Sequence, residues 1–215
     1  MIEMNTPWME MTLREYQTAL ASSSPTPGGG TAAAIALGQA SALTCMVCDL
    51  TIGREKWKEG WAYAEETVRE TIPLLTKSGI LADDDSQAFD EVMAAYKLPR
   101  ETESEKENRR KAIKLSSLKA TNVPLETARL SLALLERLPQ LARVSNVNAI
   151  SDVGVASLLA SAACKGALFN VEINLSSIPE KEQDEISRAA EEIHERCRKI
   201  SRSCMDEVKK RLSDS

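Results

Sequence analysis

Three consecutive glycines, Gly28 to Gly30, open a segment without a charged side chain that runs to Cys48. Within it Ala34, Gly38 and Ala42 recur every four residues, which is the spacing of one face of a helix. A second helix can lie closely against so smooth a stripe. The segment is long enough to cross a membrane, but it is built from Ala, Gly, Ser, Thr and Gln rather than Leu, Ile and Phe. We therefore expect a helix buried inside a soluble protein.

The remaining sequence is also helical in its periodicity. The alternating run from Phe169 to Leu175 resembles a strand, but the sequence offers no partner strand, so we assign it to the end of the preceding helix. The prediction is an all-α, single-domain bundle over residues 1–215 with small-residue seams between helices. The first expected helix is opened by a capping box at Thr12–Glu15, the second follows the glycines, and two more cover about 55–76 and 80–97, separated by Gly79. A long charged helix is expected from Thr102, with a kink or break at Pro124 and a loop near Pro139. Ser151 is expected to cap the next helix, and the last one should start at about Ser177.

Charge and cysteine content limit the classes of partner. The net charge of −5 argues against nucleic acid or an anionic membrane as the main partner. Residues 1–5 are acidic and lack an apolar core, so no signal peptide is expected. Five cysteines, an odd number placed mostly in helical patterns, favour reduced thiols and a cytoplasmic protein.

The glycine run is itself a candidate ligand site. Pro25 and Pro27 fix the approach, the glycines allow a sharp turn and close contact, and Thr31 is positioned to cap the helix that follows. Free N–H groups in a first helical turn suit a carboxylate, a phosphate or a polar heterocycle. The spacing matches neither a dinucleotide-binding fingerprint nor a P-loop, and a purely structural turn is the alternative.

Asp85 is the most informative carboxylate. At helical spacing it shares a face with Leu81, Ala88, Phe89 and Val92, so it should point inward. Burial is costly for a carboxylate and raises its pKa into a range useful for proton transfer. The alternative is a structural hydrogen bond to a neighbouring helix.

Other polar residues have ordinary structural explanations beside any functional one. Asp152 falls in a first helical turn, where the dipole favours a carboxylate in any case. Asn146 lies in a run of Ser and Asn residues that is typical of turns. Asn170 and Asn174 share one helical face. With His194 as the sole histidine, neither a Ser-His-Asp triad nor a histidine-rich metal site can form, so no metal is expected.

Several motifs, in order along about residues 12 to 200, resemble the cyclodeaminase family of folate enzymes. That family comprises the cyclodeaminase half of formiminotransferase-cyclodeaminase and the stand-alone methenyltetrahydrofolate cyclohydrolases. The segments that carry the resemblance are Pro25–Thr31, Leu50–Gly53, Asp83–Phe89, Lys97–Pro99, Asn146, Ser151–Asp152 and Phe169–Leu175.

The resemblance implies closure of 5-formimidotetrahydrofolate to 5,10-methenyltetrahydrofolate with loss of ammonia, a step of histidine degradation, or hydrolysis of the methenyl compound by a cyclohydrolase. It implies catalytic roles for Asp85, as the proton-transfer group, and Asp152, which would orient or assist it. The implied substrate-binding residues are Gly28, Gly29, Gly30, Thr31, Asn146 and Asn170. The resemblance implies a homodimer and no cofactor beyond the tetrahydrofolate substrate. Any formiminotransferase would have to be a separate protein.

Two rival hypotheses come from other classes of protein. A non-catalytic all-α interaction module would explain the helices but not an inward Asp85. A redox protein using the C-x-x-C pair Cys45 and Cys48 would require a reactive thiol of low pKa.

Overall fold

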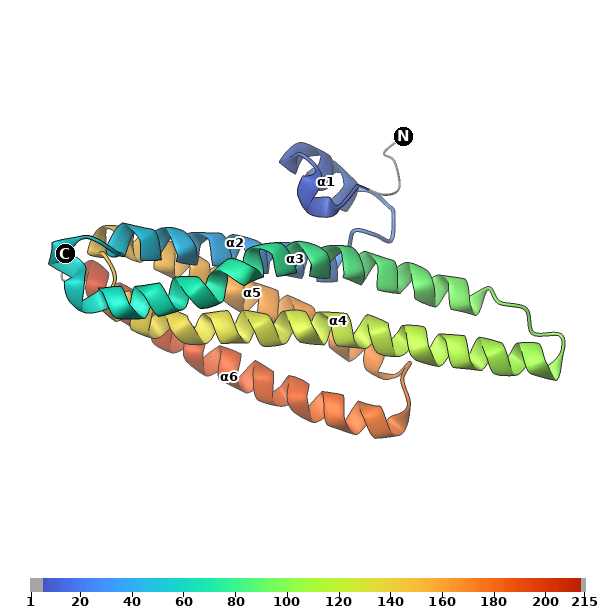
Figure 1. Ribbon diagram of the computed structural model, residues 1–215. Coiled ribbons are helices and arrows are strands. Elements are labelled where there is room, and N and C mark those ends of the chain that lie inside the picture. Colours follow the sequence, from blue (N-terminus) through green and yellow to red (C-terminus); the bar gives the residue numbers. More distant parts are fainter. Residues whose placement is uncertain (1–5, 214–215) are drawn as a thin grey trace.

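The computed structural model describes residues 6–213, which form an elongated bundle of helices without a strand (Figure 1). The all-α prediction is therefore confirmed. The expectation about a signal peptide rests on residues 1–5, which lie outside the described residues. The elements are η1 (Trp8–Glu10), α1 (Leu13–Leu20), α2 (Gly29–Thr51), η2 (Glu55–Gly60), α3 (Trp61–Tyr96), α4 (Glu103–Val144), η3 (Val147–Ala149), α5 (Ile150–Leu175) and α6 (Glu180–Ser213), where η denotes a 3-10 helix.

Side-chain capping fixes two helix starts as the sequence predicts. Thr12 and Glu15 form a reciprocal capping box at α1, and Thr102 and Glu105 form another at α4. The run that ends at Leu175 closes α5, which confirms its assignment as helix. Ser151 is not the cap of α5: the helix begins one residue earlier and Ala149 occupies the cap position.

The structure has no helix break at three positions where one was expected: Gly79, Pro124 and Pro139. Helix α3 runs unbroken through Gly79, which lets Met9 of η1 approach: a β-carbon at this position would lie 3.1 Å from Met9 Cγ. Helix α4 likewise continues through Pro124 and Pro139. A proline lacks the N–H that would bond the carbonyl four residues earlier. For Pro124 that carbonyl belongs to Ala120, and the side-chain amide of Asn174 in α5 donates to it at 2.9 Å.

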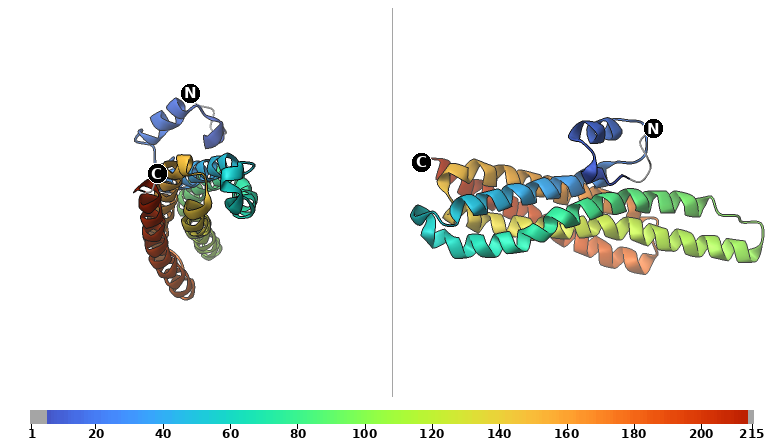
Figure 2. Two further views of the ribbon diagram at one scale, coloured as in Figure 1. Left: turned by 90° about the vertical axis from the view of Figure 1, so that its left-hand side faces the viewer. Right: turned by 45° about the horizontal axis from the view of Figure 1, so that its top comes forward.

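The core lies where α4 and α5 pack on each other and on α2 and α6 (Figure 2). Helix α4 supplies the large side chains, and α2 and α5 supply small ones, so their backbones come close. The fully buried leucines of α4 are Leu125, Leu135, Leu138 and Leu141; Ala34 and Ala40 of α2 and Ala156, Ala160, Ala163 and Ala167 of α5 are equally inaccessible.

Helices α2 and α5 are long and apolar enough to cross a membrane by length and composition. In the structure, more than half of the most apolar window of each is buried inside the protein. The two helices run antiparallel. Asn146, just before α5, donates from its side chain to the Leu50 carbonyl near the end of α2, whereas Asn170 near the end of α5 lies beside Gly29 at the start of α2. The start and end of α2 thus mark two levels along the bundle, about 30 Å apart, and α3 and α4 extend beyond the level at which α2 starts (Figure 1).

The N-terminal segment crosses the seam between α2 and α3. Trp8 of η1 is half-buried against a small cluster formed by Ala34, Leu81 and Ala82. Helix α1, in contrast, stands away from the bundle in the views of Figures 1 and 2. Its Leu13 is exposed.

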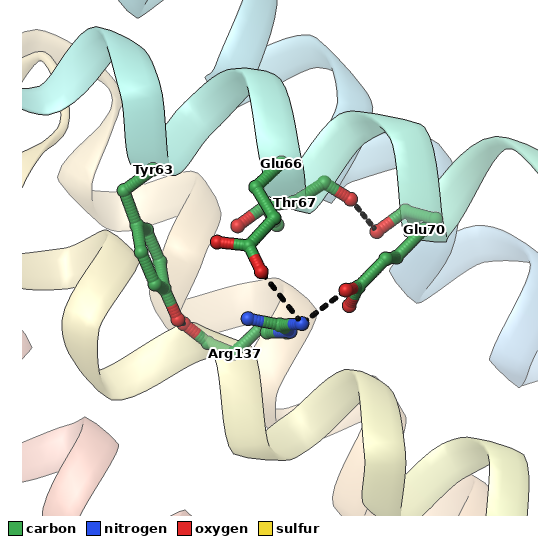
Figure 3. A network of polar contacts seen from close by, with 6 residues as sticks. Tyr63, Glu66, Thr67, Glu70 and Arg137 are labelled. Carbon is green, nitrogen blue, oxygen red and sulfur yellow. Dashed lines mark hydrogen bonds and ion pairs between the residues drawn. The ribbon is translucent and has the colours of Figure 1, made fainter.

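A polar network joins α3 to α4 on the outside of the bundle, as Figure 3 shows. The Arg137 guanidinium forms ion pairs with Glu66, at 3.4 Å, and with Glu70. The Tyr63 hydroxyl donates to the Arg137 carbonyl at 3.0 Å. Both carboxylates are about half-exposed, so solvent screens these pairs, and they contribute alignment of the helices more than stability.

Close contact at the start of α3 gives a stability prediction. A β-carbon on Gly60 would lie 2.3 Å from the carbonyl oxygen of Val144, which is backbone and cannot rotate away. Gly60→Ala should therefore lower the free energy of unfolding by about 2 to 3 kcal/mol, the usual cost of overpacking. Urea denaturation of the variant and the parent measures the difference.

Gly166→Ala is the matched control. A β-carbon there would meet the Ala33 side chain at 3.5 Å, an ordinary contact, and would improve helix propensity. We expect no loss of stability from this change. Equal destabilisation by the two substitutions would contradict the assignment of the Gly60 contact.

Candidate functional site

The start of α2 meets the middle of α3 at Asp85. The approach is so close that a β-carbon on Gly30 would lie 2.1 Å from Asp85 Oδ1. Gly30 is buried, whereas Gly29 is exposed at the first turn of α2. The glycine run therefore lets helix backbone lie directly against a carboxylate, and the close contact is made by Gly30.

Thr31 contributes to this contact in a different way from the one predicted. It is not the helix cap, because α2 begins at Gly29 with Gly28 in the cap position. The Thr31 side chain is instead buried in the first turn of the helix, and its hydroxyl donates to Asp85 Oδ2 at 3.1 Å. The Thr31 backbone N–H also hydrogen-bonds to the Asp85 carboxylate. This N–H is one of the donors that a first helical turn leaves unpaired.

The environment makes Asp85 easier to protonate than an ordinary aspartate. Burial raises the pKa of the Asp85 carboxyl, and the hydrogen bonds from the Thr31 side chain and backbone oppose that rise. Asp85 is therefore a partly desolvated carboxylate whose pKa is moved toward neutrality. This is the property expected of a group that takes up and releases protons.

Three of the predicted site regions come together near the start of α2. They are the glycine run, Asp85 with Thr31, and Asn170, whose side-chain nitrogen would lie 3.7 Å from a β-carbon on Gly29. Asn170 donates at 2.9 Å to the Gly166 carbonyl one turn earlier in α5. A polar ligand in contact with Gly29 would thus also be within reach of an amide and of Asp85.

Asn146 and Asp152 lie elsewhere. The Asn146 backbone N–H donates to the Thr51 hydroxyl at 3.0 Å, and its side chain bonds the Leu50 carbonyl, so it ties the end of α2 to the start of α5. Asp152 occupies the first turn of α5 at that same end. Given the helical rise, Asp152 is about 27 Å along α5 from Asn170. Within one chain Asp152 is therefore too far from Asp85 to orient or assist it.

Two residues of the Asp85 cluster were not predicted. The Ser86 hydroxyl lies 3.1 Å from the Thr31 hydroxyl, and the Trp8 indole N–H donates to Ser86 Oγ at 3.0 Å. Ser86 follows Asp85 directly and could have been found as a small hydroxyl beside an inward carboxylate. Trp8 carries no signal in the sequence, because it is brought in from 78 residues away.

Cys45 and Cys48 do not have the properties of a redox centre. Burial raises the pKa of the Cys45 thiol and raises that of Cys48 to about 12, with the nearby Asp49 carboxylate acting in the same direction. Both thiols are therefore protonated near neutral pH. His194 is exposed on α6. Among residues 6–213, no group of three His, Cys, Asp or Glu side chains is placed to hold a metal ion.

Thiol labelling tests this conclusion. We expect native protein to react with Ellman's reagent at Cys45 and Cys48 at least about tenfold more slowly than the same chain unfolded in urea, because attack requires the thiolate. The double variant Cys45→Ser, Cys48→Ser identifies the signal from this pair. Fast labelling of the native pair would restore the redox hypothesis.

Comparison with known proteins places the chain in a family. Residues 12–204 match the family described as formiminotransferase-cyclodeaminase. A methenyltetrahydrofolate cyclohydrolase of Methylorubrum extorquens is 40% identical over 171 residues, which cover 79% of this chain and 82% of that protein. The chain therefore belongs to the formiminotransferase-cyclodeaminase family, as its motifs indicated.

Other relatives agree in sequence and in fold. The formimidoyltransferase-cyclodeaminase of Rattus norvegicus is 32% identical over 174 residues, but this chain spans 31% of that longer protein. The crystal structure of a formiminotetrahydrofolate cyclodeaminase from Thermotoga maritima superposes with a TM-score of 0.77 at 29% identity. The match covers 96% of this chain and 98% of the other, so the two share the whole bundle.

Proposed function

We propose that this protein is a folate one-carbon enzyme, a formimidotetrahydrofolate cyclodeaminase. The observation that carries the proposal is the partly buried Asp85 held against the backbone of Gly30, beside a glycine turn that a flat ligand can approach. The named activities of the relatives, cyclodeaminase and cyclohydrolase, both act on folates. A non-catalytic interaction module would have no use for a desolvated carboxylate at this position.

In the proposed reaction, N10 of 5-formimidotetrahydrofolate attacks the formimino carbon. A tetrahedral carbon forms between N5 and N10, N10 loses its proton, and the departing nitrogen is protonated and leaves as ammonia. Asp85 would accept and return the proton, and as a carboxylate it would stabilise positive charge on the bridge. Gly28 to Gly30 would form a wall against the pterin, with Thr31 and Asn170 as its polar neighbours.

Methenyltetrahydrofolate cyclohydrolase is the second candidate, because the relative with 40% identity carries that name and is matched over most of its length. Here water attacks the methenyl carbon and the ring opens to 10-formyltetrahydrofolate. The same tetrahedral carbon forms, so the same carboxylate could serve.

Paired assays on the purified protein decide between the two. One follows the near-ultraviolet absorbance of methenyltetrahydrofolate as it forms from 5-formimidotetrahydrofolate, together with release of ammonia. The other follows decay of that absorbance above the uncatalysed rate. Hydrolysis without ammonia release would assign the cyclohydrolase, and inactivity in both assays would contradict the proposal.

We also propose that the protein works as a homodimer. Helix α5 presents an apolar stripe at helical spacing to solvent, formed by Val155, Leu158, Phe169 and Ile173, and the last two are 65% and 75% exposed. A second copy packed antiparallel on this face would bring Asp152 of the partner subunit toward Asp85. That arrangement would restore the assisting role for Asp152, and a binding role for Asn146, across the interface.

Hybrid dimers test the shared site. If Asp85 and Asp152 act in the same site from different subunits, inactive Asp85→Asn and Asp152→Asn proteins should regain about a quarter of parental activity when mixed and exchanged, because half the dimers are then hybrids and each hybrid holds one intact site. Light scattering establishes the dimer independently. A dimer without regained activity would leave Asp152 outside the site.

Location, partners and cofactors of the protein follow from its charge and from the proposed reaction. We propose a cytoplasmic location and no partner among nucleic acids or membranes, supported by the acidic charge and by the burial of α2 and α5. We propose no cofactor beyond the tetrahydrofolate substrate. The formimino group would be supplied by a separate formiminotransferase.

A further inference from the structure

A chain of hydrogen bonds leads from the N-terminal segment to Asp85. Trp8 Nε1 lies 3.0 Å from Ser86 Oγ, Ser86 Oγ lies 3.1 Å from Thr31 Oγ1, and Thr31 Oγ1 lies 3.1 Å from Asp85 Oδ2. Three elements contribute: η1, α3 and α2. The two hydroxyl-bearing residues are buried, so little water competes for their bonds.

The chemistry of the end groups fixes the direction of this chain. An indole N–H can only donate, so Ser86 Oγ accepts from Trp8. An ionised carboxylate can only accept, so Thr31 uses its single hydroxyl proton on Asp85. The Ser86 proton must then be donated to Thr31. Every hydroxyl proton points toward Asp85, which is the arrangement that favours the ionised carboxylate.

We propose that Trp8 is a positioning residue for Asp85, acting through Ser86 and Thr31. Trp8 is itself held in place by its backbone N–H, which donates to Asp83 Oδ1 at 2.9 Å, and by packing against Ala34 and Leu81. The expected effect of Trp8 on catalysis rests on the proposed function, whereas the expected effect of Trp8 on the Asp85 carboxylate does not. Trp8 lies before the first residue matched to the family, Thr12, so this part of the site comes from outside the matched region.

The hydrogen-bond chain through Thr31 is the main polar support of the Asp85 carboxylate, because the other groups near it are uncharged or bonded elsewhere. From α2 it meets Gly30 and Thr31, and α2 has no charged side chain before Asp49. From η1 the near group is Trp8, which is neutral. On α5 the residue beside Gly29 is Asn170, which is also neutral. On its own helix, Asp83 is engaged by the Trp8 backbone. The influences on the pKa of Asp85 are burial and the Thr31 hydrogen bonds, without a charged partner.

Trp8→Phe tests the proposal, because it removes the indole N–H but keeps an aromatic side chain and the backbone hydrogen bond to Asp83. Ser86→Ala breaks the same chain from within α3. The matched control is Trp61→Phe, which removes an indole hydrogen bond of 3.2 Å, to the Arg54 carbonyl, near the start of α3.

The first readout needs no activity: the Asp85 carboxyl carbon is titrated by NMR and assigned from its loss in Asp85→Asn. Weaker support for the ionised form should raise the pKa of Asp85 by about 0.5 in Trp8→Phe and in Ser86→Ala, and should leave Trp61→Phe unchanged. An unchanged titration in both test variants would overturn the proposal, whatever the protein catalyses.

The second readout is steady-state kinetics. We expect kcat to fall about three- to tenfold with KM unchanged, and the acid limb of the kcat profile to move to higher pH with the titration. An active enzyme whose kcat and acid limb are unaffected in Trp8→Phe would overturn the catalytic consequence. Inactivity of the parent protein on both folates would overturn the proposed function instead, while a shifted titration would still establish the positioning of Asp85.

Discussion

Asp85→Asn should yield a folded protein with turnover reduced by about 10²-fold or more, the typical effect of removing a proton-transfer group. Asparagine has the same shape as aspartate, so the close fit against Gly30 is retained, and its amide oxygen can still accept from Thr31. What it cannot do is gain and lose a proton near neutral pH. The loss should therefore appear in kcat and not in KM.

The same substitution should make the protein more stable at neutral pH. Because burial raises the pKa of Asp85 in the folded state, protonation favours folding, and the stabilisation present below the ordinary aspartate pKa is lost as pH rises through the folded-state value. At pH 7 the partly buried carboxylate thus lowers stability, and the neutral asparagine removes this penalty. Thermal unfolding at pH 7 should show a melting temperature equal to or above that of the parent, as is common at functional sites.

Activity and stability together separate a functional Asp85 from a structural one. Asp84→Asn is the matched control, since Asp84 is the preceding residue of the same helix, on a different face. It should leave turnover within about twofold. A folded Asp85→Asn enzyme with near-normal turnover, or one that is clearly less stable, would return Asp85 to the role of a structural hydrogen-bond acceptor.

Local patterns predicted the helices and the inward Asp85 because both depend on spacing within one segment. Leu81 and Ala88, which share the face of Asp85, are indeed buried, although Phe89 is 38% exposed. The strand-like run from Phe169 was correctly assigned to helix α5 because a single strand cannot satisfy its backbone.

The errors have a common physical cause: long-range packing changes what a local signal means. Gly79 and Pro124 are helix breakers in isolation, but Met9 occupies the space above Gly79, and Asn174 bonds the carbonyl that Pro124 leaves free. Thr31 is a residue type typical of helix caps, yet its hydroxyl donates to a carboxylate 54 residues away in the sequence.

Long-range packing is also the reason that only part of the site was predicted. Gly30, Asp85 and Asn170 are far apart in sequence, and family resemblance, not spacing, suggested that they act together. Asn146 and Asp152 carried the same signal but lie at the other end of α2 and α5. A linear motif does not reveal which end of a bundle, or which subunit, its residues serve.

Gly30→Ala should reduce turnover by about 10- to 100-fold, the second large effect expected. The added β-carbon would lie 2.1 Å from Asp85 Oδ1 and 2.6 Å from its Cγ, far inside van der Waals contact. The carboxylate must therefore rotate away, which breaks its bond to Thr31 and moves it from the bridge carbon. Misplacement of a reacting group by about 1 Å can cost about 100-fold in rate.

Gly29→Ala provides the control, because it adds the same methyl one residue earlier in the same helical turn. There the nearest atom is the Asn170 side-chain nitrogen at 3.7 Å, so the methyl fits without displacing anything. We expect kcat to stay within about threefold for Gly29→Ala, with any effect confined to KM through contact with the ligand. Measured kcat and KM for both variants, with circular dichroism to show that the helices are intact, test the argument. If Gly30→Ala were as active as Gly29→Ala, Asp85 could not be the group that handles the proton, because the methyl at residue 30 leaves no room for its carboxylate in the observed position.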